Sequence, residues 1–277
     1  MKHIPFSVAM SVYKNDEAIF FDRALQSITE EQTLMPNEIV LVVDGEVNVS
    51  IDEVIEKYLG KYPDIIKVVR LENNVGLGNA LRNAIENCSY MIIARMDSDD
   101  VAAKTRFEEQ LAFFEADETL DIVGGNISEF IGNEENIVSY RVVPSSHEDI
   151  CEYLKKRCPF NHQTVMYKKT AVIEAGGYLD LFWNEDYYLW IRMFQHGAKM
   201  ANSDSVFVNM RTGEGMYRRR GGKKYFTSEK FLQDYMLKCG IINRVTYLSN
   251  LIKRWIVQIL LPNRLRGFVF KTFARRK

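Results

Sequence analysis

The sequence predicts an α/β protein in which a mostly parallel sheet is flanked by helices and followed by a helical extension at the carboxyl end. Two observations support this prediction. Apolar runs of strand length alternate four times with helix-like stretches in residues 6–96. Parallel strands require helical crossovers of this kind, because only antiparallel neighbours can be joined by a tight turn. The last apolar run leads directly into a group of acidic residues, as expected where a buried strand emerges from the edge of a sheet.

The first half of the chain shows the alternation element by element. Continuous apolar runs predict buried strands at residues 6–13, 38–43, 65–71 and 90–96. Apolar residues at helical spacing predict the intervening helices at residues 18–28, 51–59 and 81–88. Because parallel strands are buried on both sides, we expect helices on both faces of this sheet.

The second half is less regular. Its pattern predicts two helices and two strands, at residues 106–114, 146–157, 121–131 and 162–167 respectively. Glu185 and Asp186 then open an amphipathic helix. The helix dipole favours acidic residues in a first turn, so this pair is open to a structural as well as a chemical interpretation.

Composition limits the class of protein. With 277 residues and 47% hydrophobic composition, the chain can bury a large core. The four cysteines form no Cys-x-x-Cys pair, which argues against a zinc site or a disulfide framework and favours a reducing compartment. Neither a secretory signal nor a run of about 20 apolar residues is apparent. We therefore expect a cytoplasmic protein that does not cross a membrane.

Charge is distributed unevenly along the chain. Nine of the 36 Lys and Arg residues and none of the 37 acidic residues lie in residues 241–277. This leaves 27 basic and 37 acidic side chains, a formal charge of −10, in residues 1–240. The acidic body and the absence of an RNA- or DNA-binding motif argue against a nucleic-acid partner.

Three carboxylates follow the strand predicted at residues 90–96. Asp97, Asp99 and Asp100 supply the hard oxygen ligands that Mg²⁺ or Mn²⁺ prefers, and ligands of α/β sheets bind beyond the carboxyl ends of the strands. This pattern predicts a metal–diphosphate site. The alternative is that these residues only cap the helix that follows, since Asp is a preferred N-cap residue.

A glycine-containing loop precedes the helix predicted at residues 81–88. Gly76 and Gly78 lack the third glycine of a dinucleotide fingerprint and follow the third strand rather than the first, and no P-loop motif occurs. A dinucleotide-dependent dehydrogenase and a P-loop nucleotidase are therefore not expected. The two glycines fit either direct contact with a phosphate or a tight turn of the backbone.

Several of these motifs, taken together, resemble those of the family 2 glycosyltransferases. The similar segments are residues 8–13, 43–45, 74–83, 95–100 and 176–192, in the family's order and at comparable spacing. The resemblance covers roughly residues 4–195 of the chain. It implies a GT-A fold and an inverting, metal-dependent hexosyl- or N-acetylhexosaminyltransferase that uses a nucleotide-sugar donor, with UDP-sugar favoured.

The resemblance also implies a division of the chain and a set of partners. Residues 1–225 form the catalytic domain, with a donor-binding half at 1–100 and an acceptor-binding half at 101–225, and residues 226–277 form the extension. The implied acceptor is a glycan or a polyprenyl-linked sugar in bacterial surface polysaccharide synthesis, and a homodimer is possible. The alternatives are a nucleotidyltransferase acting on sugar phosphates and a non-catalytic binding module.

The resemblance assigns roles to individual residues. The cofactor is Mn²⁺ or Mg²⁺, bound by the three carboxylates. The donor-binding residues are expected to be Val12, Tyr13, Asp44, Gly76, Asn79, Arg82, Asp97 and Ser98. The acceptor-binding residues are expected to be Gly177, Tyr178, Trp183 and, from its position in the chain, His162. For His162 a purely structural role is the alternative.

The chemistry of inverting transfer explains the implied catalytic residues. Departure of a nucleoside diphosphate develops negative charge, which a metal at Asp97 and Asp99 would offset. An attacking hydroxyl must lose a proton, which calls for a carboxylate base. By the resemblance that base is Asp186, with Glu185 as an orienting neighbour or acceptor contact.

Two basic segments lie in the last quarter of the chain. Arg218 belongs to a run of cations at residues 218–224, beside two glycines, which predicts contact with the donor diphosphate or, alternatively, a solvated charge run. Residues 241–261 and 265–273 form two amphipathic stretches flanked by cations and separated by Pro262. Basic amphipathic helices bind membrane interfaces, so we expect peripheral attachment to the inner face of the cell membrane. The alternative is that the apolar stripe packs on the catalytic domain or on a second subunit.

Overall fold

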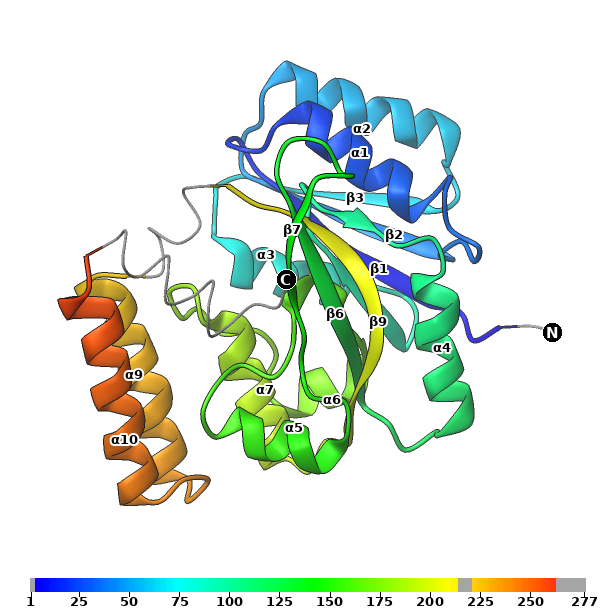
Figure 1. The fold of residues 1–277 in the computed structure, drawn as a ribbon. Helices are drawn as coiled ribbons and strands as arrows, with labels where there is room; N and C mark the ends of the chain where they lie inside the picture. Colours follow the sequence, from blue (N-terminus) through cyan, green and yellow to red (C-terminus); the bar gives the residue numbers. More distant parts are fainter. Residues whose placement is uncertain (1–2, 214–220, 263–277) are drawn as a thin grey trace.

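The computed structural model describes residues 3–213 and 221–262. Within these residues one mixed sheet has nine strands in the order β3-β2-β1-β4-β8-β6-β9-β5, with β7 paired to β6 (Figure 1). The first four strands are β1 (Phe6–Val12), β2 (Glu38–Asp44), β3 (Ile66–Leu71) and β4 (Ile92–Met96). They pair in parallel, which confirms the expectation for the first half of the chain.

Three crossover helices join these strands. They are α1 (Ala18–Ile28), α2 (Val49–Lys61) and α3 (Leu77–Asn87). The predicted start of the third helix at residue 81 is wrong, because the helix begins four residues earlier, directly after Gly76. Gly76 has a φ of 85°, a conformation that glycine adopts without steric cost, so the chain turns sharply there into α3.

The second half of the sheet contains antiparallel strands. They are β5 (Val101–Ala102), β6 (Ile122–Phe130), β7 (Ile137–Arg141), β8 (Met166–Lys168) and β9 (Met200–Arg211). Strand β8 lies antiparallel between β4 and β6, and β6 pairs in parallel with β9. The strand predicted at residues 162–167 is wrong in its first half, where a 3₁₀ turn, η1 (His162–Thr164), precedes β8.

Helices cover both faces of the sheet. Those of the second half are α4 (Arg106–Ala116), α5 (His147–Leu154), α6 (Lys169–Glu174) and α7 (Glu185–Gln195). One apolar core lies between the sheet and α1, α2 and α4, and a second lies on the opposite face with α3, α5 and α7 (Figure 1). The side chains of β4 alternate between these cores: Ile92 and Ala94 face the first, and Ile93 faces the second.

A pair of helices follows the sheet. These are α9 (Lys223–Lys238) and α10 (Arg244–Trp255), which continues into a π-helical turn, η2 (Ile256–Leu260). The two helices lie side by side at the edge of the α7 face (Figure 1). Leu232 and Met236 of α9 are part of the second core, so α9 is firmly packed, and the boundary expected at residue 225 falls inside it.

Helix α10 is packed through polar rather than apolar side chains. Asn250 is buried and donates hydrogen bonds to the Lys155 carbonyl and to Gln233 of α9. Large apolar side chains of α10 and η2 are exposed, namely Val245, Leu248, Ile252, Trp255, Ile256 and Leu260. These residues of the apolar stripe are therefore not packed on the catalytic domain, whereas Leu251 and Ile259 are half-buried and Tyr247 packs against the second core. Among the described residues, no helix is long and apolar enough to span a bilayer.

Candidate active site

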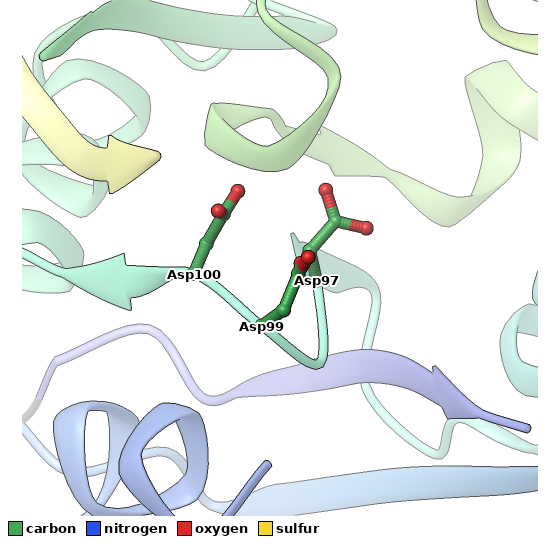
Figure 2. A group of neighbouring side chains, drawn as sticks. All are labelled: Asp97, Asp99 and Asp100. Atoms are coloured by element: carbon green, nitrogen blue, oxygen red, sulfur yellow. The ribbon is translucent and has the colours of Figure 1, made fainter. Parts of the chain in front are cut away.

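Three carboxylates gather on the turn that joins β4 to β5. Oxygen atoms of Asp97, Asp99 and Asp100 lie within 4.8 Å of one another. Figure 2 shows the three side chains on one short turn, with the carboxylates of Asp97 and Asp100 directed to the same side. The alternative that these residues cap the following helix is wrong, because α4 begins at Arg106 with Thr105 as its N-cap residue. We call this group the carboxylate cluster.

The carboxylate cluster lies above a buried arginine. Arg95 is 1% exposed and forms an ion pair with Asp97. Its Nε and Nη1 atoms have no hydrogen-bond partner in the part of the chain that the structure describes. Burial together with the neighbouring Asp97 charge raises the pKa of Asp99 to about 6, and burial also raises the pKa of Asp100. The cluster thus concentrates negative charge that a divalent cation would offset.

The end of β1 is tied to the cluster through an aspartate that sequence reasoning missed. The Asp16 carboxylate accepts hydrogen bonds from the Ser98 hydroxyl at 2.9 Å and from the Tyr13 amide at 3.0 Å. Val12 and Tyr13, two of the expected donor-binding residues, are therefore placed beside the carboxylate cluster. The only signal for Asp16 in the sequence is an acidic residue just after a strand.

Asp44, which is expected to bind the donor, forms hydrogen bonds within the protein. Its carboxylate accepts hydrogen bonds from the amides of Val75 and Gly76, at 2.7 and 3.1 Å, and from the Asn74 side chain at 3.0 Å. These bonds fix the loop before α3 against the end of β2. Asn79, which is also expected to bind the donor, donates a hydrogen bond from its side-chain amide to the Val75 carbonyl of the same loop.

The first turn of α7 carries a second acidic group, which we call the acid pair, Glu185 and Asp186. Burial and the Asp186 charge raise the pKa of Glu185 to about 7. Burial also raises the pKa of Asp186, an effect opposed by a backbone hydrogen bond and by the charges of Arg141 and Arg95. Arg95 therefore acts on both acidic groups, since its positive charge also favours ionisation of Asp99.

The immediate surroundings of Asp186 include a cysteine that the sequence did not single out. The Cys158 thiol lies 3.7 Å from an Asp186 oxygen and 3.4 Å from the Phe160 carbonyl. Gly78 of α3 lies on the other side of the acid pair, where an added Cβ would be 3.4 Å from that of Glu185. The start of α3 thus packs against the acid pair.

A cavity of about 740 Å³ opens at the acid pair. It extends from Glu185, Asp186, His162 and Trp183 to side chains of α9, α10 and η2. Trp183 is exposed and has a φ of 57°, which is uncommon for a bulky residue. The structure thus brings two of the expected acceptor residues, His162 and Trp183, together with the acid pair.

The other two expected acceptor residues lie elsewhere. Tyr178 is completely buried, and its hydroxyl lies 2.7 Å from His162 Nε2, so it reaches the cavity only through His162. Gly177 lines a different cavity of about 280 Å³ on the side of Arg82. Arg82, expected at the donor, donates from Nε to the Tyr178 carbonyl at 2.9 Å. Tyr178 therefore does not line the cavity at the acid pair, although it lines the smaller one with Gly177 and Arg82.

Only residues 221–224 of the predicted basic run at 218–224 belong to the described part of the chain. Arg218 lies outside the described residues. Lys223 and Lys224 belong to the first turn of α9, where the Lys224 ammonium lies 3.9 Å from the centre of the Phe182 ring. Arg211, at the end of β9, donates its amide proton to Asp100 at 2.8 Å and so helps to position the carboxylate cluster.

Comparison with known proteins agrees with this geometry. Residues 7–178 match the model of a family described as glycosyl transferase family 2. The UDP-Gal:alpha-D-GlcNAc-diphosphoundecaprenol beta-1,3-galactosyltransferase of Escherichia coli is 35% identical over 98% of this chain and 97% of its own length. The amylovoran biosynthesis glycosyltransferase AmsE of Erwinia amylovora is 36% identical over 85% of this chain and 86% of its own length.

Solved structures extend the comparison to the fold. The structure of S. aureus TarS 1-349 in complex with UDP-GlcNAc matches with a TM-score of 0.67 and 18% sequence identity, over 98% of this chain and 76% of that one. Strands β1 to β4 with their crossover helices and the acidic turn after β4 lie within the region matched by the family model. The chain therefore belongs to glycosyltransferase family 2 and has the GT-A fold.

Proposed function

We propose that this protein transfers a sugar from a nucleotide-sugar donor, with UDP-sugar favoured, to an acceptor hydroxyl with inversion at the anomeric carbon. One observation carries the proposal: the buried Arg95 guanidinium forms an ion pair with Asp97 of the carboxylate cluster, and its charge also opposes the rise in the pKa of both members of the acid pair. The carboxylate cluster would then bind the leaving diphosphate of a donor, and the acid pair would supply the base for attack on the same donor. The names of the E. coli and E. amylovora relatives support a role in polysaccharide synthesis.

The carboxylate cluster fits a divalent cation. Three hard oxygen donors within 4.8 Å of one another suit Mn²⁺ or Mg²⁺, and Asp97 and Asp99 are the ligands we assign, with Asp100 held behind them by the Arg211 amide. When bound, such an ion supplies positive charge to the departing diphosphate. Arg95 keeps Asp97 oriented from below the cluster.

Asp186 is the base that we assign within the acid pair. A base must be ionised before it can accept the proton of the attacking hydroxyl. The charges of Arg141 and Arg95 favour ionisation of Asp186. Arg95 also favours ionisation of Glu185, but the Asp186 charge disfavours it. Glu185 then serves as an acceptor contact or an orienting neighbour. Direct displacement requires no covalent sugar–enzyme intermediate.

The acceptor is proposed to be a glycan or a lipid-linked sugar met at the inner face of the cell membrane. The exposed apolar side chains of α10 and the exposed cation Lys253 on the same helix support this location. Basic helices with an apolar face lie in the membrane interface. The E. coli relative, whose name includes a diphosphoundecaprenol acceptor, supports the lipid-linked class.

A panel of nucleotide sugars, incubated with the full chain and Mn²⁺, tests the proposal. We expect one donor to be consumed with release of nucleoside diphosphate, and omission of the metal or addition of a chelator to suppress the release. Release of pyrophosphate would instead identify a nucleotidyltransferase. The absence of consumption of every donor, in the presence of membrane extract as an acceptor source, would contradict the proposal.

A further inference from the structure

We propose that the cavity beside the acid pair binds a lipid-linked sugar diphosphate, with the diphosphate held by Lys156 and Lys253 and the lipid leaving along the apolar side of α10. The inference rests on the proposed function and deepens it, because it names the class of acceptor and the residues that recognise it. The donor diphosphate is assigned to the carboxylate cluster, so this is a second phosphate site.

The cavity has suitable dimensions and runs between the required endpoints. Its volume of about 740 Å³ is within the range of cavities that enclose small-molecule ligands. One end is formed by Glu185 and Asp186, where an attacking hydroxyl would have to lie. The other end is formed by α10 and η2, through Lys253, Val257 and Gln258. A sugar at the first end would place its anomeric substituent toward the second.

The lining of the cavity is rich in cations. Five cationic side chains line the cavity: Arg141, Lys156, Arg157, Lys253 and Arg254. Arg254 forms an ion pair with Glu229, and Arg141 donates a hydrogen bond to the Cys158 carbonyl at 2.9 Å. Lys156 and Lys253 are exposed, and within residues 3–213 and 221–262 neither forms an ion pair. Their ammonium groups are thus available to an anion.

Arg254 ties the backbone segments that carry the two lysines to each other. It belongs to α10, next to Lys253, and its Nη2 donates to the Lys156 carbonyl at 2.9 Å. This hydrogen bond joins the segment after α5 to α10, so that two cations far apart in the chain line one cavity. A diphosphate, with two adjacent anionic groups, suits a cavity lined by two ammonium groups that are unpaired within the described residues better than an uncharged glycan does.

The outer side of α10 identifies the remainder of the ligand. Ile252 and Ile256 are 57% and 42% exposed. Ile252 directly precedes Lys253, and Ile256 follows it by three residues, about one turn along the same side. A helix of a soluble domain normally turns such residues toward its core, whereas here the core side carries Asn250 and Gln258. The cavity that carries the lysines therefore adjoins an apolar surface, and a ligand with a diphosphate head and a hydrocarbon tail satisfies both.

Calorimetry with the full chain tests the inference, using farnesyl diphosphate as a probe that lacks a sugar. Inorganic pyrophosphate and farnesol are the comparison ligands. We expect farnesyl diphosphate to bind more tightly than either, and the Lys156→Gln/Lys253→Gln variant to bind it about tenfold or more weakly, because each charge-assisted contact is lost. The control variant, Lys238→Gln/Arg244→Gln, removes two exposed cations of α9 and α10 outside the cavity and should change the affinity less than twofold.

Each other outcome overturns the inference. Equal losses in the two variants would indicate general attraction to a basic surface. Equal binding of pyrophosphate and farnesyl diphosphate would indicate a site for free phosphate without lipid. Unchanged binding in the cavity variant would place the acceptor elsewhere. Because UDP binding with Mn²⁺ is measured on the same samples, failure of the proposed function would appear as absent UDP binding, whatever the lipid probe does.

Discussion

The donor edge of the sheet and the acceptor cavity are built in different ways. The donor edge comes from the ends of β1, β2 and β4 within the first hundred residues, and its acidic side chains are held largely by backbone amides of the turns around them. The acceptor cavity combines side chains from β7 to η2, more than a hundred residues apart in the chain. We infer that changes at the donor edge disturb folding as well as chemistry. In the cavity, changes of exposed residues such as Lys253 alter recognition, whereas the Arg254–Glu229 ion pair, which also lines the cavity, contributes to folding.

The largest effect is expected at the acid pair. Asp186→Asn should lower turnover by about 10² to 10⁴-fold, because the acceptor hydroxyl loses its base, and should leave UDP affinity unchanged. Steady-state release of nucleoside diphosphate and calorimetry with UDP measure the two quantities. If Glu185→Gln abolished turnover while Asp186→Asn did not, the roles within the pair would be reversed.

At the donor edge, Asp99→Asn should weaken metal-dependent UDP binding by about tenfold or more, since the ion loses one of its anionic ligands. Calorimetry with and without Mn²⁺ gives the effect. Asp64→Asn, an exposed acid away from the cluster, is the matched control. Equal UDP affinity with and without Mn²⁺ in the unmodified protein would contradict a metal-assisted donor site.

Asp44→Ala tests whether the donor edge is coupled to stability. The change leaves the amides of Val75 and Gly76 without their acceptor, which should lower the free energy of unfolding by about 2 kcal/mol. Urea denaturation measures the loss, with the exposed neighbour Glu46 replaced by Ala as the control. Unchanged stability combined with weaker UDP binding would instead assign Asp44 to direct donor contact.

A pH series examines the acceptor side. The pKa of Glu185 in the folded protein is about 7, against 4.5 without the protein environment. The folded state therefore binds more protons between these values, and stability falls as pH rises from about 4.5 to 7. Because Glu185 is only partly buried, we expect a contribution on the order of 1 kcal/mol. Urea denaturation of Glu185→Gln at pH 5 and pH 8 should show a smaller pH dependence than the unmodified protein; an equal dependence would argue against a raised pKa.

The smallest effect concerns the outer side of α10. Ile252→Ser/Trp255→Ser should lower co-sedimentation with anionic vesicles at low salt several-fold, as apolar contact with the interface is lost. The paired control is Ile19→Ser, an exposed apolar residue of α1. Equal sedimentation of all forms would contradict attachment through α10, and sedimentation velocity would then show whether a second subunit covers this surface.

The sequence by itself determined the donor half of the molecule. Strands β1, β2 and β4 are buried on both faces, so their residues form continuous apolar runs that cannot be mistaken for exposed segments. The carboxylate cluster follows directly because the end of a parallel strand is also the edge at which ligands bind. The acid pair was found through its family resemblance and its place at the start of α7.

Several elements of the second half escaped prediction because their stability depends on distant partners. Strand β9 carries Asn, Ser and Asp, which disfavour strands, yet it is held by parallel pairing with β6. Residues 162–164 have the composition of a strand but form η1, because Asn161 and Thr164 bond to the Gly125 carbonyl from the side. The local sequence pattern carries no information about β6 as the partner of β9, or about Gly125 as the hydrogen-bond partner of Asn161 and Thr164.

The tertiary structure alone decided which way α10 faces. Periodicity predicted the helix, and an apolar stripe would ordinarily be assigned to a core. Instead Asn250 donates hydrogen bonds to the Lys155 carbonyl and to Gln233. Arg254 forms an ion pair with Glu229. These interactions place the polar side of α10 against the rest of the protein. The same orientation brings Lys253 into the cavity and leaves Trp255 outside. These partners lie 17 to 95 residues away in the chain, a separation at which sequence pattern carries no information about contact.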